Sequence, residues 1–187
     1  MNLYEHSLLK RVFALIRWCV IKILFNNKVK TKSIFYIGKN VNFFVRKGKI
    51  VFEGKTHIHD FVTLKSSGLL HIGDNFSINP YSRIICHDRI EIGENVLIAQ
   101  FVSILDHDHN ILNVENEFNS DKYITGPIKI GNNVWIGDKV TITKGVTIGN
   151  NVIIAANSVV VKNIPDNCIY GGIRAKHLKN LNLKPKV

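Results

Sequence analysis

Cysteine is scarce in this sequence, and its placement excludes two kinds of framework. The three cysteines, Cys19, Cys86 and Cys168, are odd in number, far apart and outside any C-x-x-C spacing. Such spacing supports neither a disulfide framework nor a zinc ribbon. We therefore expect the protein to work in a reducing compartment.

Long uninterrupted apolar runs are also missing. The most apolar segment, residues 7–25, is interrupted by four cations, Lys10, Arg11, Arg17 and Lys22. A segment with that many charges is too polar to span a bilayer. No small-residue cleavage site follows it, as a secretory signal peptide would require. We therefore expect a cytoplasmic protein.

Acidic residues are few at both ends of the chain. Residues 1–55 hold 12 Lys and Arg against 2 acids, residues 56–164 hold 8 against 11, and residues 165–187 hold 5 against 1. The middle is therefore not a basic platform for nucleic acid. It also lacks the pattern of aromatic residues and arginines that stacks on bases, so we expect no nucleic-acid partner.

The cationic segment near the N-terminus predicts a basic amphipathic helix. At about 100° per residue its cations fall within half of the helical wheel, and the other half is apolar. Such a helix can lie in the surface of an anionic membrane. Alternatively, its apolar side can pack on the main domain or on a second subunit. The residues of the apolar side are Leu8, Leu9, Phe13, Leu15, Ile16, Val20, Ile23 and Leu24.

A six-residue repeat dominates the rest of the sequence. Neither a helix, with 3.6 residues per turn, nor a simple strand, with a period of two, selects such spacing. A parallel β-helix does, because each unit makes one short strand and a turn, and its aliphatic residue stacks on the coil above. The series are Ile72, Ile78, Ile84; Ile92, Ile98, Ile104; Ile130, Ile136, Ile142, Ile148, Ile154, Val160; and Val134, Val140, Val146, Val152.

The turns and one interruption complete this pattern. Units such as "IGDNF" and "IGNNV" place Gly and then Asp or Asn at the turn, where a positive φ costs little. The repeat stops after Ile104 and resumes at Ile130, and the excursion begins with "DHDH", residues 106–109. A loop that interrupts a regular solenoid is usually functional. We expect a single core with appendages, divided into a helix (1–27), a β-helix (28–164, with a loop at about 106–127) and a C-terminal extension (165–187).

The sequence resembles the hexapeptide-repeat O-acetyltransferases, which include the galactoside and maltose enzymes and many polysaccharide-modifying enzymes. The resemblance is carried by "IGENVLIAQFVSILDHDHNI" and by "PIKIGNNVWIGDKVTITKGVTIGNNVIIAANSVVVKNIPDNCIYGG", in the family's order. It covers about residues 70–173. It implies an all-β fold, a left-handed parallel β-helix, because the six-residue period alone does not set the hand and crossovers are normally right-handed.

The resemblance also implies an activity. Members of the family transfer acetyl from acetyl-coenzyme A to a hydroxyl of a carbohydrate, work as homotrimers and place their active sites between subunits. Their catalytic histidine lies at the start of the protruding loop, which corresponds to His109, with His107 as the near rival. A neutral imidazole can take the proton of the attacking hydroxyl as general base. We expect Asp106 or Asp108 to orient and polarise the ring.

Further site residues follow from the same resemblance. Trp135 of "NNVWIG" corresponds to a tryptophan that lines the acceptor or coenzyme site, and Asn79 to an asparagine that contacts the acceptor hydroxyl. Coenzyme A lies in the family along a groove near the C-terminal coils, and cations there suit its 3′-phosphate. The residues expected to bind it are Gly137, Asp138, Ala155, Lys162 and Arg174. The chain departs from the family's usual Gly-Val-Pro-Ala-Lys, because it reads "GGIRAK" at residues 171–176.

Two alternatives stay open. An N-acetyltransferase acting on an amino sugar would need the same base. The γ-class carbonic anhydrases use a similar β-helix and bind zinc through three histidines, for which this chain offers several candidates, His57, His59, His71, His87, His107 and His109. The loop and "NNVWIG" match the transferases better, so we expect no metal requirement. The basic helix adds the hypothesis of peripheral contact with the inner face of the cytoplasmic membrane.

Overall fold

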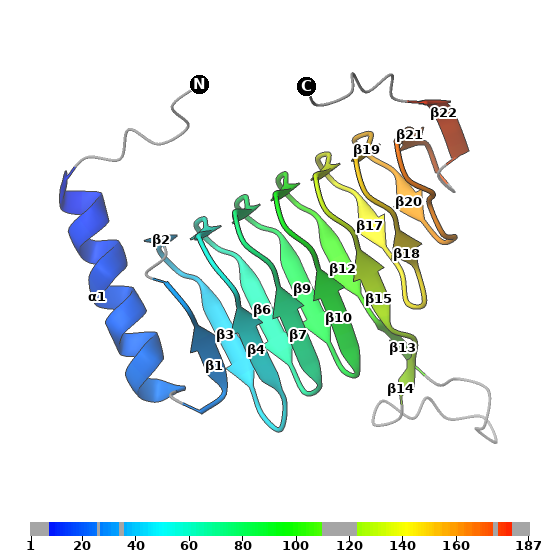
Figure 1. The fold of residues 1–187 in the computed structure, drawn as a ribbon. Helices are drawn as coiled ribbons and strands as arrows, with labels where there is room; N and C mark the ends of the chain where they lie inside the picture. Colours follow the sequence, from blue (N-terminus) through cyan, green and yellow to red (C-terminus); the bar gives the residue numbers. More distant parts are fainter. Residues whose placement is uncertain (1–7, 26, 34–35, 110–122, 174–175, 181–187) are drawn as a thin grey trace.

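The chain winds into a parallel β-solenoid of about six turns, with one helix at its N-terminal end (Figure 1). The computed structural model describes residues 8–25, 27–33, 36–109, 123–173 and 176–180. Each turn contributes one strand to each of three sheets, which meet at three corners, and the strands of successive turns of the solenoid pair in parallel.

The three sheets are named A, B and C in the order in which the chain passes through them. Sheet A contains β1 (Val29–Thr31), β4 (Lys49–Phe52), β7 (Leu69–Ile72), β10 (Arg89–Ile92), β15 (Ile128–Ile130) and β18 (Thr147–Ile148). Sheet B contains β2 (Tyr36–Ile37), β5 (Thr56–Ile58), β8 (Phe76–Ile78), β11 (Val96–Ile98), β16 (Val134–Ile136), β19 (Val152–Ile154), β21 (Cys168–Gly171) and β22 (Lys176–Asn180). Sheet C contains β3 (Asn42–Val45), β6 (Thr63–Ser66), β9 (Arg83–Cys86), β12 (Ser103–Leu105), β17 (Thr141–Ile142) and β20 (Val159–Val160).

The aliphatic residues of the six-residue series form the core, as the sequence predicts. Every one of the sixteen is exposed by 2% or less, and equivalent residues stack in register, as Ile98, Ile136 and Ile154 do in sheet B. Burying an isoleucine contributes about 1.5–3 kcal/mol relative to leaving it exposed. Repeated in every turn, this burial holds the coil together, and the predicted β-helix is confirmed.

The irregular spacing in the first half of the sequence has a simple cause. Ile58, Ile78 and Ile98 pair at intervals of 20 residues, whereas Ile136 and Ile154 pair at an interval of 18. The longer turns have two additional residues between sheet C and sheet A. The strands β9 and β10 are joined in this way by His87 and Asp88, so the "CHDR" irregularity marks an enlarged corner.

The corner between sheets A and B corrects one expectation about the turns. Positive φ angles occur at Asn75, Asn95 and Asn133, with values of 53–56°, and not at the glycine two residues before each. The glycine is needed for another reason, close approach of adjacent turns. A Cβ on Gly131 would lie 2.6 Å from the carbonyl oxygen of Gly149. The asparagine side chains also bond to one another along the corner, as Asn75 Nδ2 donates to Asn95 Oδ1 at 2.8 Å.

The corner between sheets B and C holds a partly exposed aromatic stack. Phe61, Tyr81 and Phe101 occupy equivalent positions in successive turns, each with a φ of 57–63°. Their ring centroids are 5.0 and 5.1 Å apart and the rings are nearly parallel. A left-handed conformation costs a residue with a side chain roughly 1–2 kcal/mol. The stacking offsets part of this cost.

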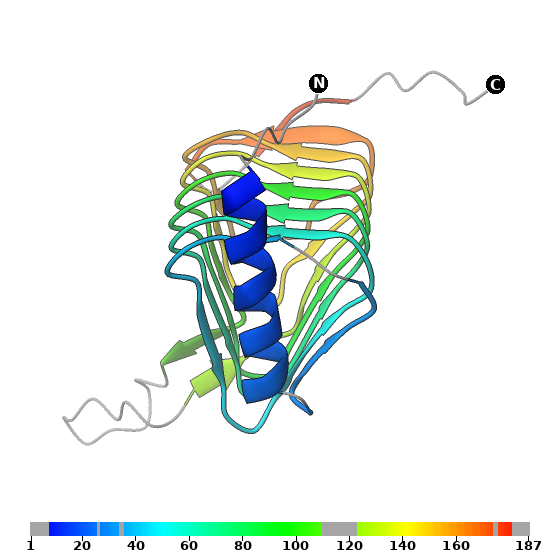
Figure 2. The same ribbon diagram turned by 90° about the vertical axis from the view of Figure 1, so that its left-hand side faces the viewer.

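The helix α1 (Leu8–Leu24) lies across the N-terminal end of the solenoid (Figure 2). It packs through Ala14, Trp18 and Ile21, and these residues and Phe25, which directly follows the helix, cover the apolar end of the first turn. These residues belong to the cationic half of the helical wheel. The alternative in which the apolar half packs on the main domain is therefore wrong, because the described side chains of that half are all exposed.

The C-terminal strands lie at the opposite end of the stack (Figure 1). The strand β21, within the range assigned to the C-terminal extension, pairs in parallel with β19 and so continues sheet B. The strand β22 then pairs with β21 in the antiparallel sense. Across the described ranges, no helix is both long and apolar enough to cross a bilayer.

Candidate active site

The excursion from the solenoid begins as a two-stranded antiparallel ribbon. It is formed by β13 (His107–His109) and β14 (Tyr123–Thr125), which project from the corner between sheets C and A (Figure 1). The predicted loop therefore leaves the solenoid at the corner that the extra residues enlarge in the preceding turns. Residues 110–122 lie outside the described part of the chain.

Three histidines and a tyrosine gather where the ribbon leaves the corner. The ring centroid of His87 lies 4.1 Å from those of both His107 and Tyr123. The rings of His107 and Tyr123 are 5.1 Å apart, and those of His109 and Tyr123 are 5.0 Å apart. We call His87, His107, His109 and Tyr123 the histidine cluster. It brings together both predicted histidines.

Sequence reasoning missed two members of this cluster. From the sequence, His87 is only one of several possible zinc ligands, and no motif marks Tyr123. The signal for His87 was its place in the "CHDR" irregularity, which puts it on the same corner as the loop one turn earlier. Tyr123 lies shortly before the repeat resumes, and only the pairing of β13 with β14 brings it to the histidines.

Asp106 anchors the base of the ribbon. Its carboxylate is fully buried and accepts hydrogen bonds from the backbone amides of His87, Asp88 and Arg89 at 2.8–3.1 Å. Its Oδ1 also lies 3.4 Å from Nδ1 of His107. Asp106 thus holds the corner of the preceding turn and faces His107, whereas the sequence led us to expect it beside the ring of His109.

Asp108 has a different partner. Its Oδ2 accepts a hydrogen bond from Nζ of Lys144 at 2.6 Å. Lys144 lies between β17 and β18, at the same corner of the next turn. Asp106 and Asp108 therefore tie the ribbon to the turns on both sides of it.

Burial and neighbouring charge change the ionisation of two groups near the ribbon. Desolvation, with a smaller effect of the His107 charge, lowers the pKa of His87 below its usual value. Desolvation, followed by the charge of Asp106, raises the pKa of Cys86 to about 12. The thiol is therefore protonated at neutral pH and does not serve as a nucleophile. The imidazole of His87 is neutral under the same conditions.

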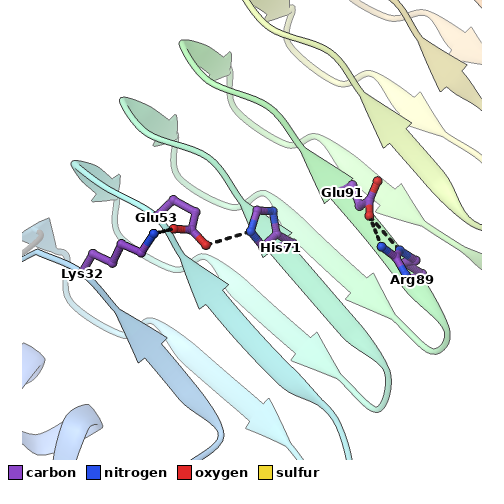
Figure 3. A network of polar contacts seen from close by, with 5 residues as sticks. All are labelled: Lys32, Glu53, His71, Arg89 and Glu91. Carbon is purple, nitrogen blue, oxygen red and sulfur yellow. Dashed lines mark hydrogen bonds and ion pairs between the residues drawn. The ribbon is translucent and has the colours of Figure 1, made fainter.

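Among the residues that the structure describes, no three His, Cys, Asp or Glu side chains are placed to bind one metal ion. The other histidines that the zinc alternative would use lie away from the histidine cluster. His71 is on the outer face of sheet A, where its Nε2 contacts Oε1 of Glu53 at 2.9 Å and Glu53 also pairs with Lys32 (Figure 3). His57 is on sheet B and His59 follows it at the next corner.

The remaining predicted residues lie on another part of the solenoid. Asn79, Gly137, Asp138 and Ala155 share the corner between sheets B and C, and Trp135, which is 50% exposed, precedes this corner on sheet B. A full strand of sheet C separates this group from the histidine cluster within one chain. Lys162 is exposed beyond β20. Arg174 lies outside the described residues.

Several groups expected to contact coenzyme A are already engaged in the solenoid. The amide of Gly137 donates to the carbonyl of Ile154 at 2.8 Å, and the amide of Ala155 to the carbonyl of Tyr170 at 2.8 Å. Oδ1 of Asp138 accepts from the amide of Gln100 at 3.0 Å. These bonds connect successive turns at the corner. The backbone amides of Gly137 and Ala155 are therefore not available as additional donors.

Comparisons with known proteins identify the family. Residues 127–162 match the bacterial transferase hexapeptide family, described as six repeats. The chain is 41% identical over 117 residues to the galactoside O-acetyltransferase of Escherichia coli, covering 63% of this chain and 57% of the relative. It is 34% identical over 127 residues to WbbJ of Escherichia coli, an O-acetyl transferase ascribed to lipopolysaccharide biosynthesis, covering 64% and 65%.

One similar protein has been solved in complex with acetyl coenzyme A. The hexapeptide-repeat-containing acetyltransferase VCA0836 of Vibrio cholerae was crystallised with acetyl coenzyme A. It is 26% identical to this chain, with a TM-score of 0.59, covering 89% of this chain and 77% of that one. Taken together with the repeat and the solenoid, these similarities show that the chain belongs to the hexapeptide-repeat acetyltransferase family. The chain spans 54–65% of the length of the curated relatives that it matches.

Proposed function

We propose that this protein is an O-acetyltransferase that moves acetyl from acetyl-coenzyme A to a hydroxyl of a sugar or polysaccharide precursor. The observation that carries this proposal is the histidine cluster at the root of the ribbon, in a chain of the hexapeptide-repeat acetyltransferase family. The name of the galactoside enzyme supports a hydroxyl acceptor, and that of WbbJ supports a polysaccharide precursor.

His109 is the proposed general base. It is exposed, so an acceptor hydroxyl can reach it, whereas the side chain of His107 is only 12% exposed between His87 and Tyr123. The imidazole of His109 takes the hydroxyl proton as the oxygen attacks the thioester carbonyl, and the carbon–sulfur bond then breaks. The leaving coenzyme A thiolate takes that proton back from the imidazolium. Such base catalysis contributes about 10²–10⁴ in rate.

The carboxylates next to the histidines position the base without touching the substrate. Asp106 faces His107 and fixes the corner under His87, and Asp108 holds the ribbon through Lys144. Their roles are therefore those of positioning residues, with the catalytic role left to His109. His107 is the rival base, and it contacts Asp106 directly.

The separation of the two predicted groups supports an active site shared between subunits of a homotrimer. In one chain, Asn79 and Trp135 lie across sheet C from the histidine cluster. In a homotrimer, the corner between sheets B and C of one subunit would lie against the histidine cluster of the neighbouring subunit, and the two together would form the active site. Acetyl-coenzyme A would then lie between subunits, near Asp138 and Lys162, as co-substrate and without a metal. The complex of VCA0836 with acetyl coenzyme A supports the choice of acyl donor.

The cellular setting is part of the proposal. We infer a cytoplasmic enzyme that contacts the inner face of the cytoplasmic membrane through residues 1–27, near lipid-linked glycan intermediates. The support is the exposed apolar half of α1.

The test is thiol release from acetyl-coenzyme A with a panel of mono- and oligosaccharides and their amino-sugar counterparts. The wild type is compared with His109→Ala, His107→Ala and, as a matched control, His71→Ala. We expect sugar-dependent release to fall at least 100-fold in the His109 variant, less in the His107 variant and not at all in the control. Equal rates in all four proteins would refute the proposed base. Release only with amino sugars would identify an N-acetyltransferase instead.

A further inference from the structure

One side of α1 is apolar and lies open to solvent. We call Leu9, Val12, Phe13, Ile16, Val20, Ile23 and Leu24 the outer face of the helix. Their side chains are 45–78% exposed. They recur at helical spacing and so form one continuous stripe. An exposed apolar area of this kind marks a surface that binds a protein or a membrane.

The helix cannot bury this stripe by turning. Its opposite side is packed on the first turn through Ala14, Trp18, Ile21 and Phe25, and Ala14 is only 3% exposed. Nη1 of Arg17 also donates a hydrogen bond to the carbonyl of Ile37 at 3.2 Å. The outer face therefore points away from the coils, and Figure 2 shows α1 in front of the solenoid, seen from the helix side.

Cations line both edges of the outer face. At about 100° per residue, Lys10 and Arg17 lie along one edge, and Arg11 and Lys22 along the other. The residues of α1 include no aspartate or glutamate. An apolar stripe between two cationic edges is typical of a helix that lies in the interface of an anionic bilayer.

Two adjoining hollows lie beside the helix on the Arg17 edge. The first, of about 400 Å³, is mainly apolar and is lined by Ile16, Val20, Leu24, Phe43 and Phe44 among others. The second, of about 240 Å³, is more polar than the first, and we call it the polar hollow; it is lined by Lys10, Phe13, Arg17, Tyr36, Lys39, His59, Asp60 and Pro80. Arg17 lines both.

The polar hollow is suited to an anion. Three of its lining residues, Lys10, Arg17 and Lys39, are cations, against a single carboxylate, Asp60. Oδ1 of Asp60 already accepts a hydrogen bond from the backbone amide of Lys39 at 2.8 Å. Cations that line one hollow can bind phosphate by charge-assisted hydrogen bonds. The polar hollow therefore offers a phosphate site directly beside an apolar groove.

We propose that the seam between α1 and the first turn binds one anionic phospholipid of a bilayer. Its phosphate lies between Lys10, Arg17 and Lys39, and an acyl chain follows the groove past Ile16 and Val20. The outer face of the helix lies among the surrounding lipids. This proposal deepens the membrane contact of the proposed function, on which it rests, and it is independent of acetyl transfer.

Charge decides between a lipid and a second copy of the chain. If two outer faces packed together, the cationic edges of one helix would meet those of the other, and α1 supplies no acid to neutralise them. An anionic bilayer neutralises all four cations of the helix. The bound helix lies in the membrane plane, so the coils of the solenoid stack away from the bilayer.

The test is co-sedimentation of the full-length chain with vesicles of phosphatidylglycerol and phosphatidylcholine, or of phosphatidylcholine alone. The wild type is expected to prefer the anionic vesicles by at least tenfold. Lys10→Gln combined with Lys39→Gln should lower that binding roughly 25-fold, because each cation near an anionic surface contributes about a fivefold preference. Lys55→Gln combined with Lys129→Gln removes the same charge from exposed sites elsewhere, and should lower it by less than twofold.

A second variant tests the outer face itself. Ile23→Asp changes a side chain that is 78% exposed, so the fold should persist, as circular dichroism will check, while vesicle binding is lost. Equal binding to both vesicle types, or equal loss in the two lysine pairs, would overturn the phosphate site. Self-association that Ile23→Asp abolishes, without vesicle binding, would assign the face to a second copy. Acetyl transfer to a soluble sugar, measured without vesicles, separates these results from failure of the proposed enzyme activity.

Discussion

Asp106 should be a stability determinant of the ribbon as well as a neighbour of the histidines. The change to asparagine preserves the shape of the side chain but replaces one acceptor oxygen by an NH₂ group. In the wild type, Oδ2 accepts from the amides of Asp88 and Arg89, and both oxygens accept from the amide of His87. The one oxygen of asparagine can accept from some of these amides, but its NH₂ group, itself a donor, must then face another of the backbone N–H groups.

The expected cost follows from these contacts. A hydrogen bond to a charged acceptor contributes about 1.5–3 kcal/mol, and Asp106→Asn loses the charge and at least one bond. We therefore expect its free energy of unfolding to fall by about 2–3 kcal/mol. Asp106→Ala leaves three amides without this acceptor, at about 1 kcal/mol or more each. Its loss should reach about 3–5 kcal/mol, toward the upper end of point substitutions.

The assay is urea unfolding followed by circular dichroism, at one protein concentration, because assembly would make stability depend on concentration. Asp88→Asn is the matched control, since Asp88 lies at the same corner but is exposed. It should change the free energy of unfolding by no more than about 0.5 kcal/mol. If Asp106→Asn were as stable as this control, the carboxylate would not be holding the corner, and the reasoning would fail.

Three further predictions concern corners and ionisation. Tyr81→Ala should lower the free energy of unfolding by about 1–3 kcal/mol, because it removes stacking on both Phe61 and Phe101; a smaller loss in urea melts would argue against the stack. Lys139→Asn should raise the free energy of unfolding by about 0.5–1 kcal/mol, because the φ of Lys139 is 57° and asparagine tolerates that conformation better than lysine does. Burial lowers the pKa of His87, so the folded state disfavours its protonation. Stability should therefore fall as pH drops below about 6.5, and less steeply in His87→Gln; identical slopes would contradict this.

The positions of the core residues could be predicted from the sequence because the solenoid is nearly one-dimensional. Each turn contacts only the turns beside it, so a period of six maps directly onto inward-pointing positions. The same logic located the excursion at Ile104 and the histidines at its start. The six-residue pattern predicted the corners less well. Gly131 is required there because adjacent turns approach closely, and the positive φ occurs at the asparagine two residues later.

The histidine cluster was only partly predictable. His107 and His109 are adjacent but one in the sequence, so their proximity is local. His87 and Tyr123 reach them through pairing between turns and across the ribbon, at separations of 20 and 14–16 residues. The partners of Asp106 and Asp108 are equally remote in sequence. Contacts of this kind leave no periodic trace in the chain.

The amphipathic helix shows most clearly what the sequence determines and what only the tertiary structure decides. The sequence by itself determined that residues near the N-terminus form a helix with an apolar half and a cationic half, since composition and period are local properties. Only the tertiary structure decided which half meets the protein. Trp18, Ile21 and Phe25 match the open apolar end of the first turn, and that fit leaves the more apolar half facing outward. Burial depends on the shape of the partner surface, and a linear pattern does not encode it.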